Sequence, residues 1–292
     1  MILRIKRRKF KYYCLSLFFL LFILFCPLLI KNYSTKKINP HLMYVHYINV
    51  DQGDSMLIQV NNKNILIDSG PKSGKKHLIN FLNTHKISTL DYVIATHPHD
   101  DHIGNMASII NTYKVKSFYA PKVYSSTKSF EMMVDALMTH NLKIIPIARG
   151  CSTINLGSDT CVEVFSPINE SYDNENNYSP VMKITFGNTS FLFTGDAETE
   201  VENALLSLND NLQCNVLKIG HHGSSSSTSE LFLKEVNPEY AVISVGRNNM
   251  YGHPNKDILS RLKQSGINIF RTDLKNNITF ISDKNKISIK YS

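Results

Sequence analysis

Cysteine is scarce in this chain, and its spacing excludes one kind of metal site. Five cysteines occur among 292 residues, and no two of them form a C-x-x-C pair. Thiolate zinc sites usually take their cysteines in such pairs, so the sequence argues against one. Internal repeats and low-complexity tracts are also missing. A hydrophobic content of 42% and this length fit one large α/β domain with an appendage.

Acidic residues are missing from residues 1–37, although this segment holds nine of the 32 basic residues. Residues 38–292 therefore have 23 basic against 24 acidic residues, a net charge of −1. The basic charge belongs to the N-terminal segment and not to the remaining domain. A near-neutral domain has no bulk attraction for nucleic acid, so any such binding must depend on local patches.

The N-terminal segment predicts a single membrane anchor. Residues 14–30 contain no charged side chain, and as a helix they would span roughly 26 Å. The positive-inside rule places the basic residues 1–11 in the cytoplasm. We therefore predict a transmembrane helix at 12–30, a linker at 31–42 and an extracellular domain at 43–292. A cleaved signal peptide is the alternative, but no small-x-small cleavage site follows Ile30.

Two cysteines of the exported domain flank a predicted hairpin turn. Cys151 and Cys161 stand on either side of residues 157–159. An oxidising exterior favours disulfides, so we predict a bond between them. The alternative is that both are small, buried apolar residues.

Alternating apolar patterns and turn residues predict many strands interleaved with helices. Strands are expected within 43–50, 53–60, 64–70, 91–97, 117–123, 142–148, 181–187, 189–196, 214–220, 240–246, 268–273, 278–282 and 286–291, with a hairpin at 152–167. Helices are expected within 77–86, 106–113, 129–141, 200–208, 225–236 and 257–266. Two runs of strands with interleaved helices indicate two sheets with helices outside.

Residues 95–105, ATHPHDDHIGN, contain the densest cluster of ligand-type side chains. His97, His99, Asp101 and His102 lie within six residues, although the chain has only 11 histidines. Imidazole and carboxylate together suit zinc, manganese or iron. Residues i and i+2 point the same way in an extended chain, so His97 and His99 can bind one ion while Asp101 and His102 face a second. A single-metal site and a solvated loop are the alternatives.

Further motifs extend this cluster. HPHDDHIGN is followed by FLFTGDAE and LKIGHHGS, and INVDQGDSMLI, ILIDSG, YAVISVG, YGHP and RTD surround them. Together they cover about residues 44–282 and resemble the metallo-β-lactamase superfamily, in particular the extracellular domain of the ComEC family of competence DNA-channel proteins. The resemblance implies an α/β fold, a four-layered αββα sandwich with two divalent metal ions, zinc or manganese, at the sheet edge.

The resemblance also implies a role for individual residues. The expected metal ligands are His97, His99, Asp101, His102, Asp196 and His222. Asp196 would bridge the ions, although a turn residue after a strand is its alternative role. The expected catalytic residues are Asp101, His221 and His253, acting with a hydroxide held between the ions. His222 is favoured over His221 as the ligand, and His221 and His253 would contact substrate; an exposed loop histidine is the alternative for His253.

Three further features surround this ligand set. Asp68 is a candidate to orient a ligand histidine or, equally, to form a turn. Amide groups at Ser224–Ser227 could hold an anion, while Thr228 or Ser229 caps the following helix. Many superfamily members have another histidine before the bridging aspartate, but none occurs between His140 and His221. The part of this chain that corresponds to that histidine offers Asn176, Asn177 and Ser179 instead.

These observations favour a metal-dependent phosphodiesterase or nuclease that acts on DNA or RNA, with single strands preferred. The alternatives are a phosphorylcholine-esterase-like or β-lactamase-like hydrolase, and a non-catalytic binding module tethered to the membrane. The filled ligand positions argue against the binding module. The chain lacks a polytopic membrane channel, so DNA transport by this chain alone is not expected. The sequence does not indicate an oligomeric state.

Overall fold

The computed structural model describes residue 39 and residues 41–291, which belong to a compact unit of residues 38–292. The predicted cytoplasmic segment 1–11, the membrane helix 12–30 and most of the linker 31–42 lie outside the described residues. Among the residues described, no helix has both the length and the apolar character needed to span a membrane.

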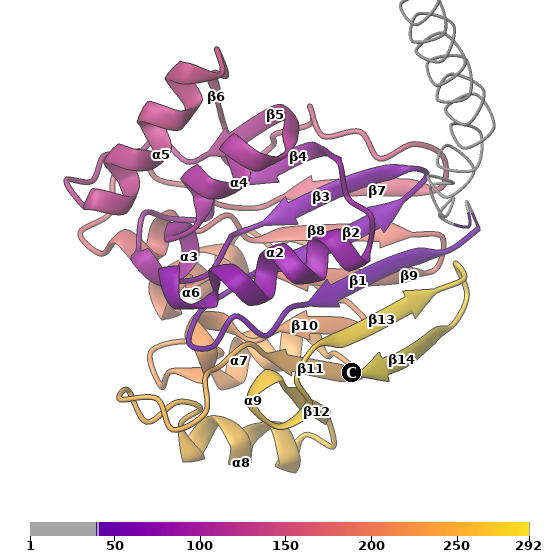
Figure 1. Cartoon of the computed structure of the whole chain (residues 1–292). Coiled ribbons are helices and arrows are strands. Elements are labelled where there is room, and N and C mark those ends of the chain that lie inside the picture. Colours follow the sequence, from indigo (N-terminus) through magenta and orange to yellow (C-terminus); the bar gives the residue numbers. More distant parts are fainter. Residues whose placement is uncertain (1–38, 40, 292) are drawn as a thin grey trace, which may run out of the picture. The chain divides into compact units, whose positions relative to one another are not determined.

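Eight strands form the first sheet, which carries both chain ends of the described unit (Figure 1). In spatial order they are β14 (Ile287–Tyr291), β13 (Ile278–Ser282), β1 (Met43–Tyr47), β2 (Met56–Val60), β3 (Lys63–Ile67), β4 (Thr89–Ile94), β5 (Lys114–Ala120) and β6 (Ile144–Pro146). Strands β3 to β6 run parallel and the others pair antiparallel. Asn61 and Asn62 both have positive φ, as a two-residue hairpin turn requires.

Six strands form the second sheet. Their order is β12 (Asn268–Arg271), β11 (Tyr240–Ile243), β10 (Val216–Lys218), β9 (Thr189–Phe193), β8 (Met182–Phe186) and β7 (Thr160–Val164). Strands β9 to β12 are parallel, whereas β7, β8 and β9 pair antiparallel. The strands expected at 181–187 and 189–196 are β8 and β9, and they pair as a hairpin.

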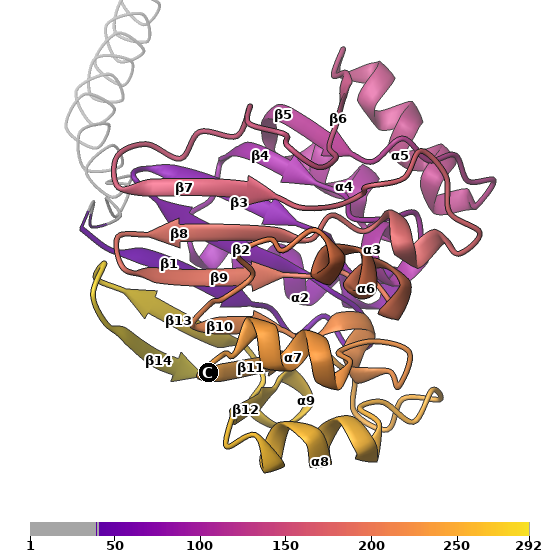
Figure 2. The ribbon, with the colours of Figure 1, turned by 180° about the vertical axis from the view of Figure 1, so that it is seen from behind.

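The helices cover the outer faces of the two sheets, as expected. They are α2 (Lys75–Thr84), α3 (Asp100–Ile103), α4 (Met106–Thr112), α5 (Lys128–Thr139), α6 (Thr199–Ser207), α7 (Glu230–Val236), α8 (Lys256–Gln264) and α9 (Thr272–Lys275), with 3₁₀ turns η1 (Lys72–Gly74), η2 (Glu175–Tyr178) and η3 (Gly220–Gly223). One apolar cluster fills the space between the sheets, a second packs α2, α4 and α5 on the first sheet, and a third packs α6, α7 and α8 on the second. Figures 1 and 2 show these helix layers from opposite sides. The αββα sandwich is therefore confirmed.

The predicted hairpin at 152–167 and its disulfide are wrong. Residues 151–157 form no strand, and β7 pairs with β8 instead. Cys151 and Cys161 are both free thiols. Cys151 packs on the core between the sheets, as Val162 of β7 does. Successive side chains of a strand point to opposite faces, so the exposed Cys161 points away from that core and from Cys151.

Candidate metal centre and cavity

The loop after β4 brings His97 and His99 together. His97 Nε2 lies 3.0 Å from His99 Nδ1. The other nitrogen of each ring faces a polar group: His97 Nδ1 faces the hydroxyls of Thr96 and Ser179, and His99 Nε2 lies 3.2 Å from Glu175 Oε2. The Glu175 carboxylate can only accept, which puts a proton on His99 Nε2, and the Thr96 hydroxyl, which donates to Asp68, can accept from His97 Nδ1. In this tautomer two lone pairs face each other. Because lone pairs repel, a cation beside both atoms fits this arrangement.

A second set of ligand atoms joins the two halves of the chain. Asp101, His102, Asp196 and His222 each offer one atom within 4.8 Å of all the others. Asp196 Oδ2 lies 3.2 Å from His102 Nε2 and 3.4 Å from His222 Nε2. Both of these ring nitrogens are buried without a hydrogen-bond partner among the described residues. Buried polar atoms normally have partners, so their absence here fits a metal ion.

Groups behind the two histidines fix which ring nitrogen faces the centre. His102 Nδ1 donates to Asp68 Oδ2 at 2.8 Å, and His222 Nδ1 donates to the Ser244 carbonyl at 2.9 Å. Asp68 itself accepts hydrogen bonds from the amide and hydroxyl of Thr96. These contacts leave each Nε2 lone pair directed at the ligand cluster. The structure thus places Asp68 in the orienting position that the sequence offered as one of two roles.

The electrostatics of the cluster also fit a cation. Burial lowers the pKa of His97 well below its ordinary value, which keeps the ring neutral as a ligand must be. Burial opposes the charged form of His102 as well, but Asp196, Asp101 and Asp68 outweigh it and raise its pKa well above the ordinary value. The carboxylates therefore concentrate negative potential where the ligand atoms converge.

The turn η3 places the two consecutive histidines in different surroundings. His221 and His222 both have left-handed backbone conformations, with φ of 45° and 53°, which are uncommon for residues other than glycine. This turn buries His222 in the ligand cluster, whereas His221 stays part-exposed, with Nε2 3.8 Å from Asp196 Oδ2. His221 Nδ1 lies 3.1 Å from Glu198 Oε1, which orients the ring. Sequence reasoning missed Glu198, which directly follows the TGDA motif.

A buried lysine beneath the cluster was also missed. Lys218 and Asp54 are both fully buried, and Lys218 Nζ lies 2.5 Å from Asp54 Oδ2. The ammonium also donates to the Gly195 carbonyl and lies 3.8 Å from Asp196 Oδ1. Burial works against this charge, but Asp54 and Asp196 outweigh it and raise the pKa of Lys218. The sequence contained a signal for this residue, because a lysine inside the apolar strand NVLKIG indicates a buried charge.

The loop before β2 contacts the metal loop directly. The Asp54 amide donates to the Asp101 carbonyl. Gly53 has a φ of 148°, and a Cβ there would lie 2.2 Å from the same carbonyl oxygen. Glycine is therefore required for this close approach.

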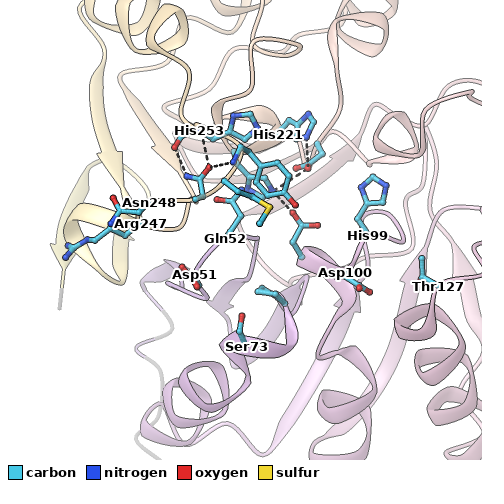
Figure 3. Close-up of a pocket in the computed structure, with 17 residues that line it drawn as sticks. Asp51, Gln52, Ser73, His99, Asp100, Thr127, His221, Arg247, Asn248 and His253 are labelled. Atoms are coloured by element: carbon cyan, nitrogen blue, oxygen red, sulfur yellow. Dashed lines mark hydrogen bonds and ion pairs between the residues drawn. The ribbon is translucent and has the colours of Figure 1, made fainter.

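An open cavity of about 730 Å³ lies over the cluster. It is lined by Asp51, Gln52, Pro71, Ser73, His99, Asp100, Asp101, Thr127, Asp196, His221, His222, Arg247, Asn248, Asn249, Met250, Tyr251 and His253. Figure 3 shows Arg247 and Asn248 on the opposite side of the cavity from Thr127, with His221 and His253 between them. All three expected catalytic residues, Asp101, His221 and His253, therefore line one cavity.

Aromatic rings continue from the centre to the rim of the cavity. His253 contacts His221 edge to face, with ring centroids 5.7 Å apart, and Tyr251 stacks on His253 at 5.9 Å. Tyr251 and Met250 are 62% and 90% exposed, so the loop after β11 presents an apolar surface to solvent. Burial and His221 lower the pKa of His253, which favours a neutral ring.

The predicted anion site at Ser224–Ser227 is not supported. The amides of Ser224, Ser226 and Ser227 already donate to groups within the turn. The Glu202 carboxylate takes the next two amides of the loop. The Ser229 hydroxyl caps α7, as one expected alternative had it.

Comparison with known proteins agrees with this fold and site. Residues 48–247 match the metallo-beta-lactamase superfamily, so the chain belongs to that family. It is 34% identical over 254 residues to ComE operon protein 3 of Bacillus subtilis, and 30% identical over 234 residues to competence protein ComA of Neisseria gonorrhoeae. These matches cover 81% and 78% of this chain but 32% and 31% of the relatives, so the chain spans about a third of their length.

Solved structures show the same fold at lower identity. The Bacillus subtilis metallo-beta-lactamase fold protein YhfI gives a TM-score of 0.56 at 14% identity, covering 82% of this chain and 99% of that one. The Ignicoccus hospitalis metallo hydrolase Igni18 gives 0.55 at 17% identity, covering 82% and 98%. The expected class of enzyme, a hydrolase of the metallo-β-lactamase superfamily, and the resemblance to competence proteins are thus confirmed.

Proposed function

We propose that this chain is a metal-dependent phosphodiesterase that cleaves single-stranded DNA or RNA. The observation that carries the proposal is the convergence of two ligand sets on Asp196 at the floor of an open cavity. When bound, two divalent ions would lower the pKa of a water and stabilise charge on both the attacking and the leaving oxygen of a phosphodiester. The six expected ligands, His97, His99, Asp101, His102, Asp196 and His222, supply the donor atoms.

Three side chains of this chain would act on the substrate. Asp101 has 30% of its side chain exposed, while His222 Nε2 lies 3.3 Å from its Oδ2. Burial opposes its charged form, but His102 and His222 outweigh it and lower the pKa of Asp101, so it is a carboxylate that can orient the attacking water by accepting a hydrogen bond. His221 is held by Glu198 with Nε2 directed to the centre, and in its doubly protonated form it can give the Nε2 proton to the leaving oxygen while Nδ1 keeps its hydrogen bond to Glu198. The neutral ring of His253 can donate a hydrogen bond to a phosphate oxygen.

The rim of the cavity favours a single strand over a duplex. Tyr251 presents an exposed ring at this rim, and Arg247 lines the same cavity. Unstacked bases bind such rings, while a near-neutral domain provides little attraction for long duplexes. The competence and recombination names of the relatives are consistent with a nucleic-acid substrate.

We further propose that residues 12–30 anchor the chain in the membrane with the catalytic domain outside the cell. The basic flank of residues 1–11 supports this orientation. Protease added to intact cells should digest residues 38–292. Protection until the cells are lysed would refute this topology.

The activity is tested with the purified chain, labelled single-stranded DNA and RNA, and either manganese or zinc. We expect endonucleolytic products that require added metal and are absent with Asp196→Ala. Nitrocefin and a phosphorylcholine ester serve as competing substrates. Rapid turnover of either one, without cleavage of nucleic acid under both metals, would replace this proposal with the β-lactamase-like or esterase-like alternative.

A further inference from the structure

The His97–His99 end of the centre has fewer protein ligands than the other end. It offers His97 Nε2, His99 Nδ1 and a shared oxygen of Asp196, whereas the other end has two imidazoles and two carboxylates. No histidine lies between His140 and His221 to complete it. The segment that closes this end is η2, where the Glu175 carboxylate contacts the outer nitrogen of His99.

The sequence offers three candidates in place of the missing histidine, Asn176, Asn177 and Ser179, and the last two are engaged elsewhere. Asn177 Oδ1 accepts the Glu198 amide, and its Nδ2 donates to Glu200. The Ser179 hydroxyl accepts the Asp196 amide and faces the outer nitrogen of His97. Both residues therefore hold the surrounding chain and have no free atom to offer an ion.

Asn176 differs from both. It is 5% exposed, and its Nδ2 donates to Glu198 Oε1 at 3.1 Å. A carboxylate only accepts hydrogen bonds, so this contact fixes the orientation of the amide. The remaining atom, Oδ1, is buried and has no partner among the described residues. The same Glu198 oxygen contacts His221 Nδ1, and the preceding residue, Glu175, contacts His99, so Asn176 stands in the chain next to residues that line the metal site.

The same property marks the ligand cluster itself. His102 Nε2 and His222 Nε2 are also buried without a hydrogen-bond partner in the described part of the chain. The side-chain amide oxygen of Asn176 therefore shares a feature with the atoms that face the metal centre, and a bound cation would satisfy it.

We propose that Asn176 Oδ1 is a ligand of the ion held by His97 and His99, in the place that a third histidine takes in related sites. This inference rests on the proposed function only in requiring a bound metal. Replacing an imidazole nitrogen with an amide oxygen shifts the preference of the site from zinc toward manganese. Glu198 is the positioning residue, because one of its oxygens orients both the Asn176 amide and the His221 ring.

Metal titration of the full-length chain tests the proposal without any activity assay. We expect two manganese ions per wild-type chain, one bound more tightly than the other. Asn176→Ala should weaken the second ion at least tenfold, and Asn176→His should shift that site toward zinc. Asn169→Ala is the control, since this exposed side chain lies on the same polar loop and only its backbone amide has a hydrogen-bond partner among the described residues, and it should leave both affinities unchanged.

A second measurement does not depend on any variant. In the manganese-loaded wild-type chain with ¹³C-labelled asparagine carboxamides, electron–nuclear double resonance should detect a carbon coupled to manganese. Absence of that coupling, or unchanged binding of both ions in Asn176→Ala, would overturn the assignment. Two-ion binding without cleavage of any phosphodiester would instead refute the proposed function and leave this assignment intact.

Discussion

Replacing Lys218 with methionine would leave a carboxylate buried without its partner. Lys218 and Asp54 are both inaccessible to solvent, and the lysine ammonium is the cation nearest to that carboxylate in the described structure. Methionine keeps the length of the side chain but removes its charge. The variant therefore tests the electrostatic role of the ammonium with little change in packing.

The expected effect is large because neither group can be solvated in place. Breaking a buried ion pair by removing one partner destabilises a protein by roughly 3–5 kcal/mol. The stability of a whole domain is typically about 5–15 kcal/mol. Lys218→Met should thus remove a large share of the free energy of unfolding. Metal should restore part of it, because a bound cation compensates the carboxylates of the same cluster.

Urea denaturation of the metal-free chain measures the effect. With a slope of about 3 kcal/mol/M, we expect the midpoint to fall by roughly 1 M or more. The double variant Asp54→Asn/Lys218→Met removes both charges and should recover much of the loss. A single variant as stable as the wild-type chain, or a double variant no more stable than the single one, would show that the pair does not act as an ion pair.

Three further predictions concern the metal centre and the cavity. His99→Ala and Asp196→Ala should each lower the metal content measured by elemental analysis and abolish hydrolysis; full metal content and turnover in both would remove them from the ligand set. Asp68→Asn should weaken metal binding about 10- to 100-fold by loosening the orientation of His102, and calorimetry with unchanged affinity would contradict that role. Tyr251→Ala should weaken binding of a single-stranded oligonucleotide by about 1–3 kcal/mol, while Tyr251→Phe keeps the stacking. Tyr124→Ala, which removes an 80% exposed ring outside the cavity lining, is the control, and an equal effect of both alanine variants would exclude stacking on Tyr251.

The sequence was sufficient to predict most of the fold because its local signals agree with the final packing. The Asn61-Asn62 turn and the Gly187-Asn188 turn each join two apolar strands, and both form hairpins in the structure. The loop at 95–105 follows a buried strand, and the structure brings its four ligand-type residues to one place. These features depend on residues that are close in the sequence.

The missed features depend on residues that are far apart. Asp54 lies in the loop before β2 of the first sheet and Lys218 ends β10 of the second, so the two meet only when the sandwich closes. Glu198 contacts Asn176 and His221, each more than 20 residues away. The wrong disulfide has the opposite cause: Cys151 and Cys161 are near in sequence, but β7 pairs with β8, which directs Cys161 away from the core. Proximity along the chain was a poor guide where sheet pairing decided the outcome.

The two oxygens of Asp196 explain why the centre needs both sheets. Oδ2 faces histidines from the loop after β4 in the first sheet and from η3 after β10 in the second. Oδ1 lies on the side of Lys218, the last residue of β10. Because the two oxygens have different partners, the rotation of the Asp196 carboxylate is fixed. Oδ2 is directed at the ligand atoms, while the Lys218 ammonium attracts Oδ1. The buried ion pair beneath the centre therefore positions the residue that joins the two ligand sets, and a change at Lys218 should alter metal binding as well as stability.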